Sequence, residues 1–328
     1  MTALPRAVSP VPVPVPGEQE AERARRREDR RRRFRRDRTL LIMTVPAVVL
    51  LIVFNYVPMF GTVTAFQNYS IYAGFLHSPW AGLQTFQSLF ADPLFWGALK
   101  NTLVLSVVQL VLYFPIPIVL ALVLNSILSS KVRSVVQAIV YLPHFFSWVL
   151  VVTFFQETLG GAGALNQFLR QHGIATWDIM TNPETFKYLV TAQVVWKEAG
   201  WGIIVFLAAL AAVDQELYEA SAADGAGRWR RLWHITLPGI RSVVVLLLVL
   251  RLGNALTVGF EQMLIQRQAV GRDAAEVLDT FAYYYGVVNA NFSYGAAASL
   301  FKGVLSLILI LLANKIAHLM GEDGFYRR

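Results

Sequence analysis

Four charged side chains lie inside stretches of sequence that are otherwise apolar: Lys197, Glu198, Arg251 and Lys302. A charge inside a lipid bilayer is costly, so such residues usually face the interior of a helix bundle or a water-filled cavity. There they can bind a polar or charged solute, or they can pair with other charges and hold helices together. The sequence supports both roles equally, and both stay open at this point.

The pairing interpretation requires partners of opposite charge. Lys197 or Lys302 could pair with Glu198, or with Glu261 near the end of an apolar stretch. Lys302 could instead extend its ammonium group toward the membrane surface. Because neighbouring residues on a helix do not face each other, we expect Lys197 and Glu198 each to find a partner elsewhere.

A second group of polar residues lies in a loop between two apolar segments, with the sequence YEASAADGAGRWRRLWHITLPGI (218–240). Its alanine-rich start favours a short helix. We expect this helix to stop at Gly225 and Gly227, because glycine accepts the positive φ of a sharp turn. The tryptophans and arginines that follow predict an amphipathic helix at the head-group boundary. Pro238 suits the first turn of the next helix, where no backbone N–H is needed.

The start of this loop also has the properties of a docking surface. Ala220 and Ser221 have small side chains, so the backbone of another protein surface can approach closely. Glu219 beside them can pair with a basic residue of a partner. The loop therefore predicts a contact with another protein rather than a site of catalysis.

These residues must be positioned by helices that cross a membrane. Hydrophobic residues make up 55% of the 328 residues and charged residues 15%, against roughly a quarter charged in an average soluble domain. Several apolar runs approach the roughly 20 residues that span a hydrocarbon core. We predict an all-α, polytopic membrane protein. Its six spans are expected at 39–60, 98–125, 134–157, 188–212, 239–262 and 295–318.

The distribution of lysine and arginine predicts the orientation of the spans. Basic residues concentrate in the N-terminal tail, in the loops 126–133 and 213–238 and at the C-terminal end, whereas the loop 61–97 has none. Both termini and the 213–238 loop are therefore expected in the cytoplasm, with the basic tail contacting anionic lipid rather than nucleic acid. The expected division is a disordered basic tail at 1–38, a six-helix membrane domain at 39–318 and a C-terminal tail at 319–328.

Several kinds of chemistry are excluded by what the sequence lacks. It has no cysteine, and its five histidines are too scattered for a zinc motif such as H-E-x-x-H. None of its six lysines follows a glycine, so the G-K-[ST] ending of a nucleotide-binding loop is missing. A membrane-embedded enzyme would need a metal-binding pair or paired aspartates within the spans, and neither is found. We expect no catalytic residue, no metal and no cofactor on this chain.

The 218–240 loop matches the signature E-A-A-x3-G-x9-I-x-L-P. Here the signature is Glu219-Ala220-Ser221, Gly225, Ile235 and Leu237-Pro238, with the spacing intact and Ser221 in place of the second alanine. The chain thus resembles the membrane subunits of bacterial binding-protein-dependent ABC importers. FNYVPMFG (54–61), YLPHFFSWVLV (141–151) and WKEAGW (196–201) resemble the lipoprotein-permease-like branch, which includes permeases for alginate-type and rhamnogalacturonan-type oligosaccharides. The resemblance covers residues 40–320.

The resemblance implies a fold, a set of partners and a division of labour. The fold is that of a type I ABC importer permease, with six helices in the bacterial cytoplasmic membrane and a cytoplasmic coupling helix. A second, similar permease and an ATPase dimer that uses ATP and magnesium would complete the complex, and an extracytoplasmic binding protein would deliver an oligosaccharide. The residues implied in coupling to the ATPase are Glu219, Ala220, Ser221, Gly225, Leu237 and Pro238.

For an oligosaccharide, the polar residues of the spans would form the solute path. Aromatic rings and amides suit sugar rings and hydroxyls, and cations suit the carboxylates of uronic acids. The excess of cations within the spans slightly favours an anionic solute. A non-sugar solute is the alternative within this family, and the coupling signature argues against a secondary carrier. The predicted path residues are Trp196, Lys197, Glu198, Arg251, Asn254, Glu261, Gln262, Tyr285 and Lys302.

Overall fold

The computed structural model describes residues 37–38, 40–319 and 321. The predicted N-terminal and C-terminal tails lie almost wholly outside these residues. The chain divides into two compact units, Met1–Gly61 and Thr62–Arg328, and each is described by itself. Every named element in the described part of the chain is a helix.

The described part of the first unit is a long apolar helix that runs on into the start of the second. Leu40–Phe66 comprises 27 residues, and none of those in its most apolar window is buried. It includes a π-helical turn η1 (Ile52–Tyr56), α2 (Val57–Met59) and a 3-10 segment η2 (Phe60–Phe66). This helix confirms the first predicted span.

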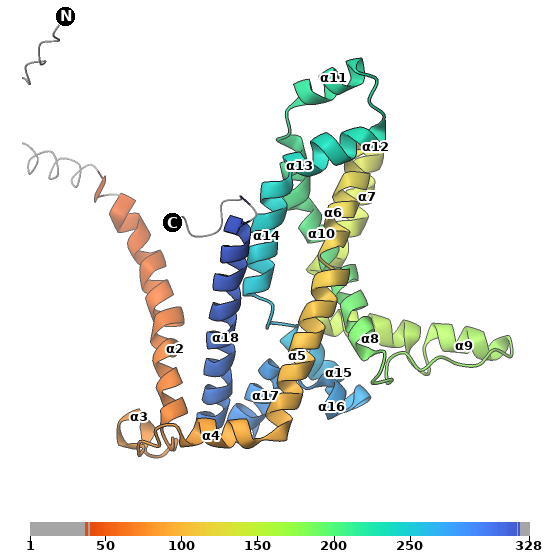
Figure 1. Cartoon of the computed structure of the whole chain (residues 1–328). Coiled ribbons are helices and arrows are strands. Elements are labelled where there is room, and N and C mark those ends of the chain that lie inside the picture. Colours follow the sequence, from red (N-terminus) through yellow and green to blue (C-terminus); the bar gives the residue numbers. More distant parts are fainter. Residues whose placement is uncertain (1–36, 39, 320, 322–328) are drawn as a thin grey trace, which may run out of the picture. The chain divides into compact units, whose positions relative to one another are not determined.

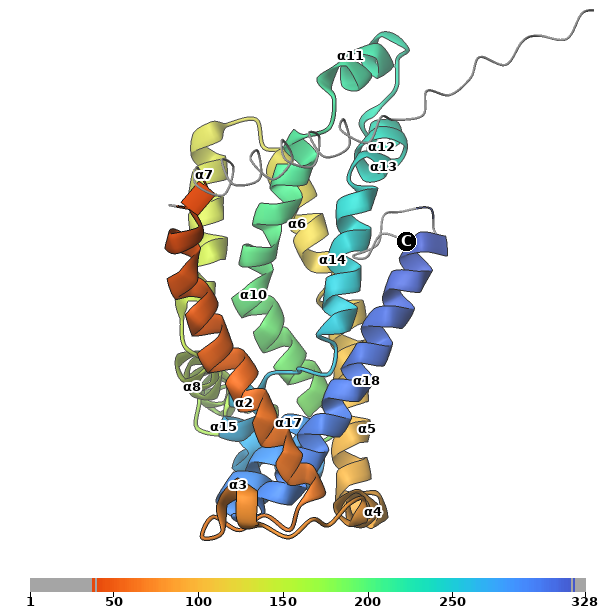
Figure 2. The same cartoon turned by 90° about the vertical axis from the view of Figure 1, so that its left-hand side faces the viewer.

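The second unit is built on long helices that pack along one another. α10 packs against α5, α6 and α14, and α14 packs along α18. Figure 2 shows α10, α14 and α18 side by side. These helices are α5 (Pro93–Leu112), α6 (Pro115–Asn125), α10 (Phe186–Ala211), α14 (Arg241–Gly253) and α18 (Phe292–Leu319).

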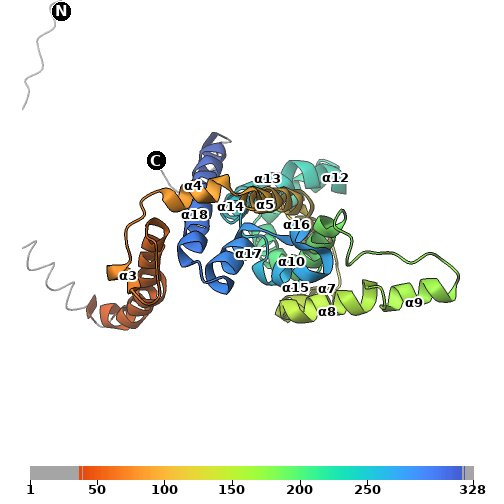
Figure 3. The same ribbon diagram turned by 90° about the horizontal axis from the view of Figure 1, so that it is seen from below.

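Shorter helices flank and connect the long ones. Figures 1 and 3 show α9 extending sideways beyond α8, away from the long helices, while α8 itself packs against α10 and α15. Before α10 come α3 (Gly74–His77), α4 (Gln84–Ala91), α7 (Ser130–Tyr141), η3 (Leu142–Phe145), α8 (Trp148–Leu159) and α9 (Ala164–Gln171). After it come α11 (Gln215–Ala223), α12 (Arg228–Arg231), η4 (Leu232–Thr236), α13 (Leu237–Gly239), α15 (Phe260–Val270), α16 (Arg272–Ala275), α17 (Leu278–Tyr283) and η5 (Tyr284–Val288).

Among the described residues, five helices are long and apolar enough to cross a membrane, and a sixth span results if a bent pair is counted as one. Besides the first, three predicted spans are confirmed by Pro93–Asn125, Phe186–Ala211 and Phe292–Leu319. The first of these three changes from α5 to α6 at Tyr113, just before Pro115.

The predicted span 134–157 is wrong as a continuous helix. The chain leaves the helical conformation at Phe146 and Ser147, and the Ser147 hydroxyl accepts a hydrogen bond from the N–H of Leu150 at 3.3 Å to begin α8. Pro143 has no N–H to continue the helical ladder, and serine is a preferred N-cap, so the break has a local cause. The helix of this region that is long and apolar enough to cross a membrane is Trp148–Gln171.

The predicted span 239–262 is also wrong in its bounds. α14 ends at Gly253, and Gly259 takes a left-handed φ of +92° before α15 begins. Such a conformation cannot continue a right-handed helix. The sixth span comes instead from the bent pair Arg228–Gly239 and Arg241–Gly253, whose axes differ by 58°.

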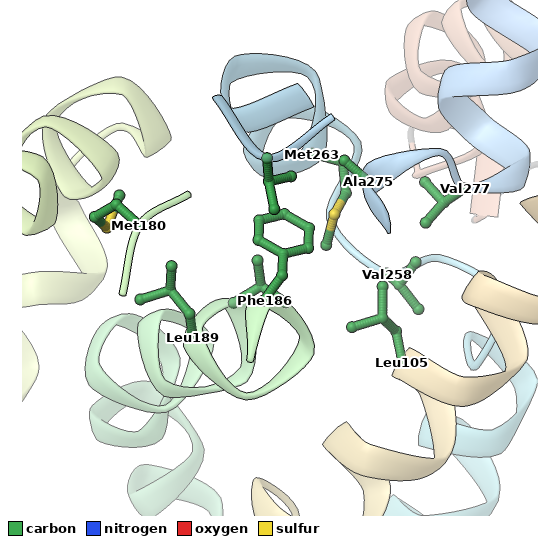
Figure 4. Close-up of a cluster of buried hydrophobic side chains, with 10 residues drawn as sticks. Leu105, Met180, Phe186, Leu189, Val258, Met263, Ala275 and Val277 are labelled. Carbon is green, nitrogen blue, oxygen red and sulfur yellow. The ribbon is translucent and has the colours of Figure 1, made fainter. Parts of the chain in front are cut away.

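A buried apolar cluster fixes the end of the second unit opposite α11. Figure 4 shows Phe186 and Leu189 of α10 near Met263 of α15, with Leu105 of α5 and Val258 at one side. All five side chains are at most 6% exposed. Since the cluster joins α5, α10 and α15, the loops at this end are held by the long helices.

Candidate functional sites: the 213–238 loop and the polar clusters of the spans

The 213–238 loop begins with a capped helix. The Asp214 side chain accepts a hydrogen bond at 2.9 Å from an N–H in the first turn of α11. At the other end Gly225 takes φ = +70°. The N–H groups of Gly225 and Ala226 donate to the carbonyls of Ala222 and Ser221, at 3.1 and 2.9 Å. This pair of bonds is a Schellman motif, and it confirms the predicted stop at Gly225.

Two other expectations for the loop are wrong. Gly227 has an extended conformation, with φ −69° and ψ 168°, and serves as the N-cap of α12. Pro238 does not begin α14, because the helical stretch that starts at α12 runs through it before the 58° bend. The N–H of Leu237 donates to the carbonyl of Leu232. This wider π-helical turn lies where Pro238 would otherwise interrupt a regular ladder.

α11 presents the signature residues to solvent. Glu219, Ala220 and Gly225 are exposed, and Ser221 is half-buried with its hydroxyl donating to the Tyr218 carbonyl at 2.9 Å. Figure 1 shows α11 beyond the end of α10, at one tip of the second unit. Within the described part of the chain Glu219 has no ion-pair partner. This surface is therefore available to another protein.

The opposite face of the loop is tied to the long helices. The Tyr218 hydroxyl and the Thr236 hydroxyl share a hydrogen bond at 3.0 Å. Gly239 lies so close to Val213 that an added Cβ would meet a methyl group of that valine at 2.9 Å. Val213 and Ile240 belong to one buried apolar cluster with residues of α6 and α10. A force applied to α11 is therefore transmitted to α10 and to the bend that precedes α14.

Lys197 and Glu198 lie in one polar cluster with His144. The Lys197 ammonium group donates to the His144 carbonyl at 2.6 Å and lies 3.3 Å from the Glu198 carboxylate. Glu198 also contacts His144 Nδ1 at 2.8 Å, and the imidazole stacks on Trp201. The expectation that the two neighbours do not face each other is wrong, because the long lysine side chain reaches the adjacent carboxylate. The expectation that each has a partner elsewhere is confirmed by His144.

Arg251 is held by neutral groups. Its guanidinium donates to the Gln109 side-chain oxygen at 2.9 Å and lies over the Tyr113 ring, 5.3 Å from the centroid. The Tyr113 hydroxyl is 3.5 Å from the backbone carbonyl of Glu198, which links Arg251 to the preceding cluster. No carboxylate of the residues that the structure describes lies within 4.0 Å of Arg251.

Lys302 pairs with Asp279 rather than with Glu198 or Glu261. Its ammonium group is 2.5 Å from the Asp279 carboxylate and 3.1 Å from the Thr257 hydroxyl. The pair lines a hollow of about 560 Å³. The aromatic walls of this hollow are Phe260, Tyr283 and Phe292. Lys302 is thus the one predicted path residue that lines it.

The other predicted path residues are dispersed. Trp196 stacks on Phe154 of α8 with centroids 5.3 Å apart, and Tyr285 accepts a hydrogen bond from Arg272 at 2.7 Å. Asn254 and Glu261 are exposed. The structure therefore brings Lys197, Glu198 and Arg251 together but does not gather the nine predicted residues at one site.

Gln262 is fully buried in a group of three glutamines. Its amide nitrogen donates to the side-chain oxygen of Gln193 at 2.6 Å and to the Val190 carbonyl at 2.9 Å. The Gln266 amide donates to the same Gln193 oxygen at 2.9 Å. These bonds join α10 to α15, so Gln262 has a structural role in this conformation.

A buried acid that sequence reasoning missed ties α15, α16 and α17 together. The Glu276 carboxylate is 4% exposed and accepts hydrogen bonds from Arg267 at 2.7 Å, Arg272 at 3.1 Å and Thr280 at 2.6 Å. Burial lowers the pKa of Arg272, but its hydrogen bond to Tyr285 and its contacts with Glu276 raise it, and the net pKa lies above the usual value. Arg272 is therefore a permanent cation in this network.

The comparisons with known proteins agree with this architecture. Residues 113–321 match the family described as "Binding-protein-dependent transport system inner membrane component". The polygalacturonan/rhamnogalacturonan transport system permease protein YteP of Bacillus subtilis (strain 168) is 44% identical over 293 residues, covering 89% of this chain and 91% of that protein. The protein LplB of the same organism is 41% identical over 294 residues, covering 89% and 92%.

Solved structures of ABC transporters also resemble this chain. A chain of a bacterial alginate ABC transporter, in complex with an alginate pentasaccharide-bound periplasmic protein, aligns with a TM-score of 0.81 at 36% identity. The alignment covers 89% of this chain and 98% of that chain. A chain of a bacterial ABC transporter involved in the import of the acidic polysaccharide alginate aligns with a TM-score of 0.80 at 37% identity, covering 88% and 97%.

Proposed function

The chain belongs to the family of binding-protein-dependent transport system inner membrane components, and on this basis we propose that it carries an acidic oligosaccharide through the membrane. It is a multi-pass permease subunit of an ABC importer, with the helical fold of the alginate transporter chains. The observation that carries the mechanism is the exposed helix α11 ending at Gly225, anchored to two membrane helices.

In this proposal α11 is the coupling helix. Glu219, Ala220, Ser221 and Gly225 form the surface that docks on an ATPase subunit, and the exposure of Glu219, Ala220 and Gly225 supports this role. Leu237 and Pro238, at the end of the helical stretch before the 58° bend, pass the movement of the ATPase to α14, while Val213 passes it to α10. ATP binding and hydrolysis then rock the long helices between inward-facing and outward-facing states.

The substrate class rests on relatives and on one residue. The similar proteins are a permease for polygalacturonan and rhamnogalacturonan and a transporter for alginate, an acidic polysaccharide. Arg251 supports an acidic substrate because no carboxylate of the described residues lies within 4.0 Å of its guanidinium, which is held by Gln109 and Tyr113 instead. We place Arg251, Lys197, Glu198 and Trp196 on the sugar path, where a uronate carboxylate would bind the guanidinium.

The other residues that the sequence predicted for the sugar path can contact sugar only if the helices rearrange. Lys302 lines a hollow but is already neutralised by Asp279, and Gln262 is enclosed by other glutamines. Asn254, Glu261 and Tyr285 lie at helix ends or in the Arg272 network. Alternating access would have to expose them to sugar in another state of the cycle.

We further propose the assembly and its orientation. The permease pairs with a second, similar permease and with two ATPase subunits, which bind ATP and magnesium and carry out hydrolysis. An extracytoplasmic binding protein delivers the sugar. The complex lies in a bacterial cytoplasmic membrane with α11 and both chain termini in the cytoplasm, as the excess of basic residues on that side supports.

Solute-dependent ATPase activity tests the proposal. The chain is reconstituted with its second permease, ATPase and binding protein, and a panel of neutral and uronic oligosaccharides is added. We expect uronic oligosaccharides to stimulate hydrolysis more than neutral ones. If a peptide or lipid stimulates the assembled complex and no sugar does, the permease assignment stands and the oligosaccharide substrate is wrong.

A further inference from the structure

A hollow of about 670 Å³ lies between the end of α6 and the start of α12. Figure 1 shows α12 beside the end of α6, at the end of the second unit that carries α11. Arg228 and Arg231 line one side, and Leu122 and Val123 of α6 line another. The hollow contains none of the four residues proposed to dock on the ATPase, so it calls for a separate explanation.

The two arginines have no protein acceptor in the described part of the chain. Neither guanidinium donates a hydrogen bond to a described residue, and neither lies within 4.0 Å of a described carboxylate. The Nε of Arg231 is buried and has no hydrogen-bond partner. Because two guanidinium groups with no described carboxylate beside them line the same hollow, they indicate an anionic ligand with several acceptor oxygens. Arginine pairs bind phosphate in this way.

The other wall of the hollow is apolar and continuous with a membrane-spanning helix. Val123 is 54% exposed on the last turn of α6, and Trp229 at the rim is 75% exposed. Tryptophan is enriched at the head-group boundary of membranes. A free phosphate ion would gain nothing from an apolar wall, whereas a phospholipid would place its phosphate on the arginines and an acyl chain along α6.

We propose that this hollow binds the phosphate head group of an anionic phospholipid from the leaflet on the α11 side, which rests on the orientation given in the proposed function. Two adjacent cations favour an anionic lipid over a zwitterionic one. Since the arginines precede the 58° bend, the bound lipid holds α12 against α6 beside the element that turns into α14. The lipid composition of the membrane then modulates the coupling between the ATPase and the membrane helices, without any contact between lipid and the sugar path.

Lipid binding to the assembled, detergent-purified complex tests this site. Short-chain phosphatidylglycerol and phosphatidylcholine are titrated, and bound lipid is measured by native mass spectrometry. We expect phosphatidylglycerol to be retained preferentially. Arg228→Gln and Arg231→Gln should each weaken its binding about fivefold, because one basic residue near an anionic membrane surface contributes about 1 kcal/mol. Arg230→Gln is the matched control, since Arg230 lines a neighbouring hollow instead.

Three results would overturn the lipid site. Equal loss in Arg230→Gln would mean that only the general positive charge of the loop matters. Unchanged binding in both Arg228→Gln and Arg231→Gln would remove the site itself. Full displacement of phosphatidylglycerol by millimolar inorganic phosphate would identify a free anion as the ligand. Sugar-stimulated ATPase activity of the same complex in phosphatidylcholine vesicles tests the proposed function separately, so failure of either idea is distinguishable from failure of the other.

Discussion

No described carboxylate lies in direct contact with the Arg251 guanidinium, whereas Lys197 and Lys302 each contact a carboxylate. A carboxylate beside a cation cancels much of the attraction that the cation would exert on an anionic solute. The amide oxygen of Gln109 and the ring of Tyr113 hold the Arg251 guanidinium without neutralising it. Selectivity for an acidic sugar should therefore depend on this residue more than on the other two cations.

Replacing Arg251 tests this view directly. In Arg251→Gln we expect uptake of uronic oligosaccharides to fall about tenfold or more, since a hydrogen bond to a charged group contributes roughly 1.5–3 kcal/mol. Uptake of a neutral oligosaccharide of equal length should change little. Arg251→Lys keeps the charge and should retain most of the acidic uptake. Equal loss for neutral and acidic sugars in Arg251→Gln would mean that the residue is structural.

Gly225 carries a prediction about coupling. Its φ of +70° is one that asparagine and aspartate also adopt, and an added Cβ would meet nothing within 4 Å. Gly225→Asp should therefore leave folding and membrane insertion intact, yet place a charge on the proposed docking surface. We expect sugar-stimulated ATPase activity and transport to be lost in Gly225→Asp and largely kept in the isosteric Gly225→Asn. Transport at the normal rate in Gly225→Asp would refute the docking role.

At the scale of helices, the local conformation of α15, α16 and α17 depends on one buried carboxylate. Glu276 accepts hydrogen bonds from both Arg267 and Arg272, and the Asn101 amide of α5 donates to its backbone carbonyl at 3.0 Å. Removing one member of a buried ion pair leaves an uncompensated charge, which typically costs 3–5 kcal/mol. The position of helices as short as α16 and α17 depends on such contacts with neighbouring helices.

Glu276→Gln should therefore lower the thermal stability of the purified permease by several degrees, because the guanidinium groups of Arg267 and Arg272 lose their buried counter-charge. Asp273→Asn is the matched control: Asp273 is exposed on α16, the short helix that directly precedes Glu276, so its replacement should leave the melting temperature nearly unchanged. Intrinsic tryptophan fluorescence during heating measures both variants. Equal melting temperatures for the two variants would show that the Glu276 network does not stabilise this end of the molecule.

Of the six spans that hydropathy predicted, four are confirmed, because a long apolar run is sufficient to indicate a membrane helix. It could not predict the break at Phe146–Ser147 or the end of α14 at Gly253, since both are set by capping and backbone conformation inside apolar sequence. The alanine-rich start of the loop and Gly225 correctly predicted α11 and its stop, because these residue types themselves shape the backbone, whereas Gly227 was wrongly expected to share the turn.

Partners of the charged residues were the least predictable part of the site. Asp279 and His144 come from segments distant in sequence from Lys302 and Lys197, so only packing brings them together. Gln109 is a polar residue in an apolar run, which could have indicated that it has a polar partner. Nothing in the sequence, however, indicates that this partner is Arg251. Periodicity indicates which residues share a helix face and gives no information on which faces meet.

At the scale of the whole molecule, the orientation in the membrane determines which end meets the ATPase and which meets the binding protein. The chain has no cysteine, so single cysteines report their own position. Tyr72 and Leu128 are 102% and 97% exposed in loops assigned to opposite sides. In intact cells we expect a membrane-impermeant maleimide to label Tyr72→Cys but to label Leu128→Cys only after permeabilisation, because basic loops stay cytoplasmic. The reverse pattern would invert the topology and place α11 on the side of the membrane that has no ATPase. Labelling of both residues in intact cells would contradict the single span between them, Pro93–Asn125.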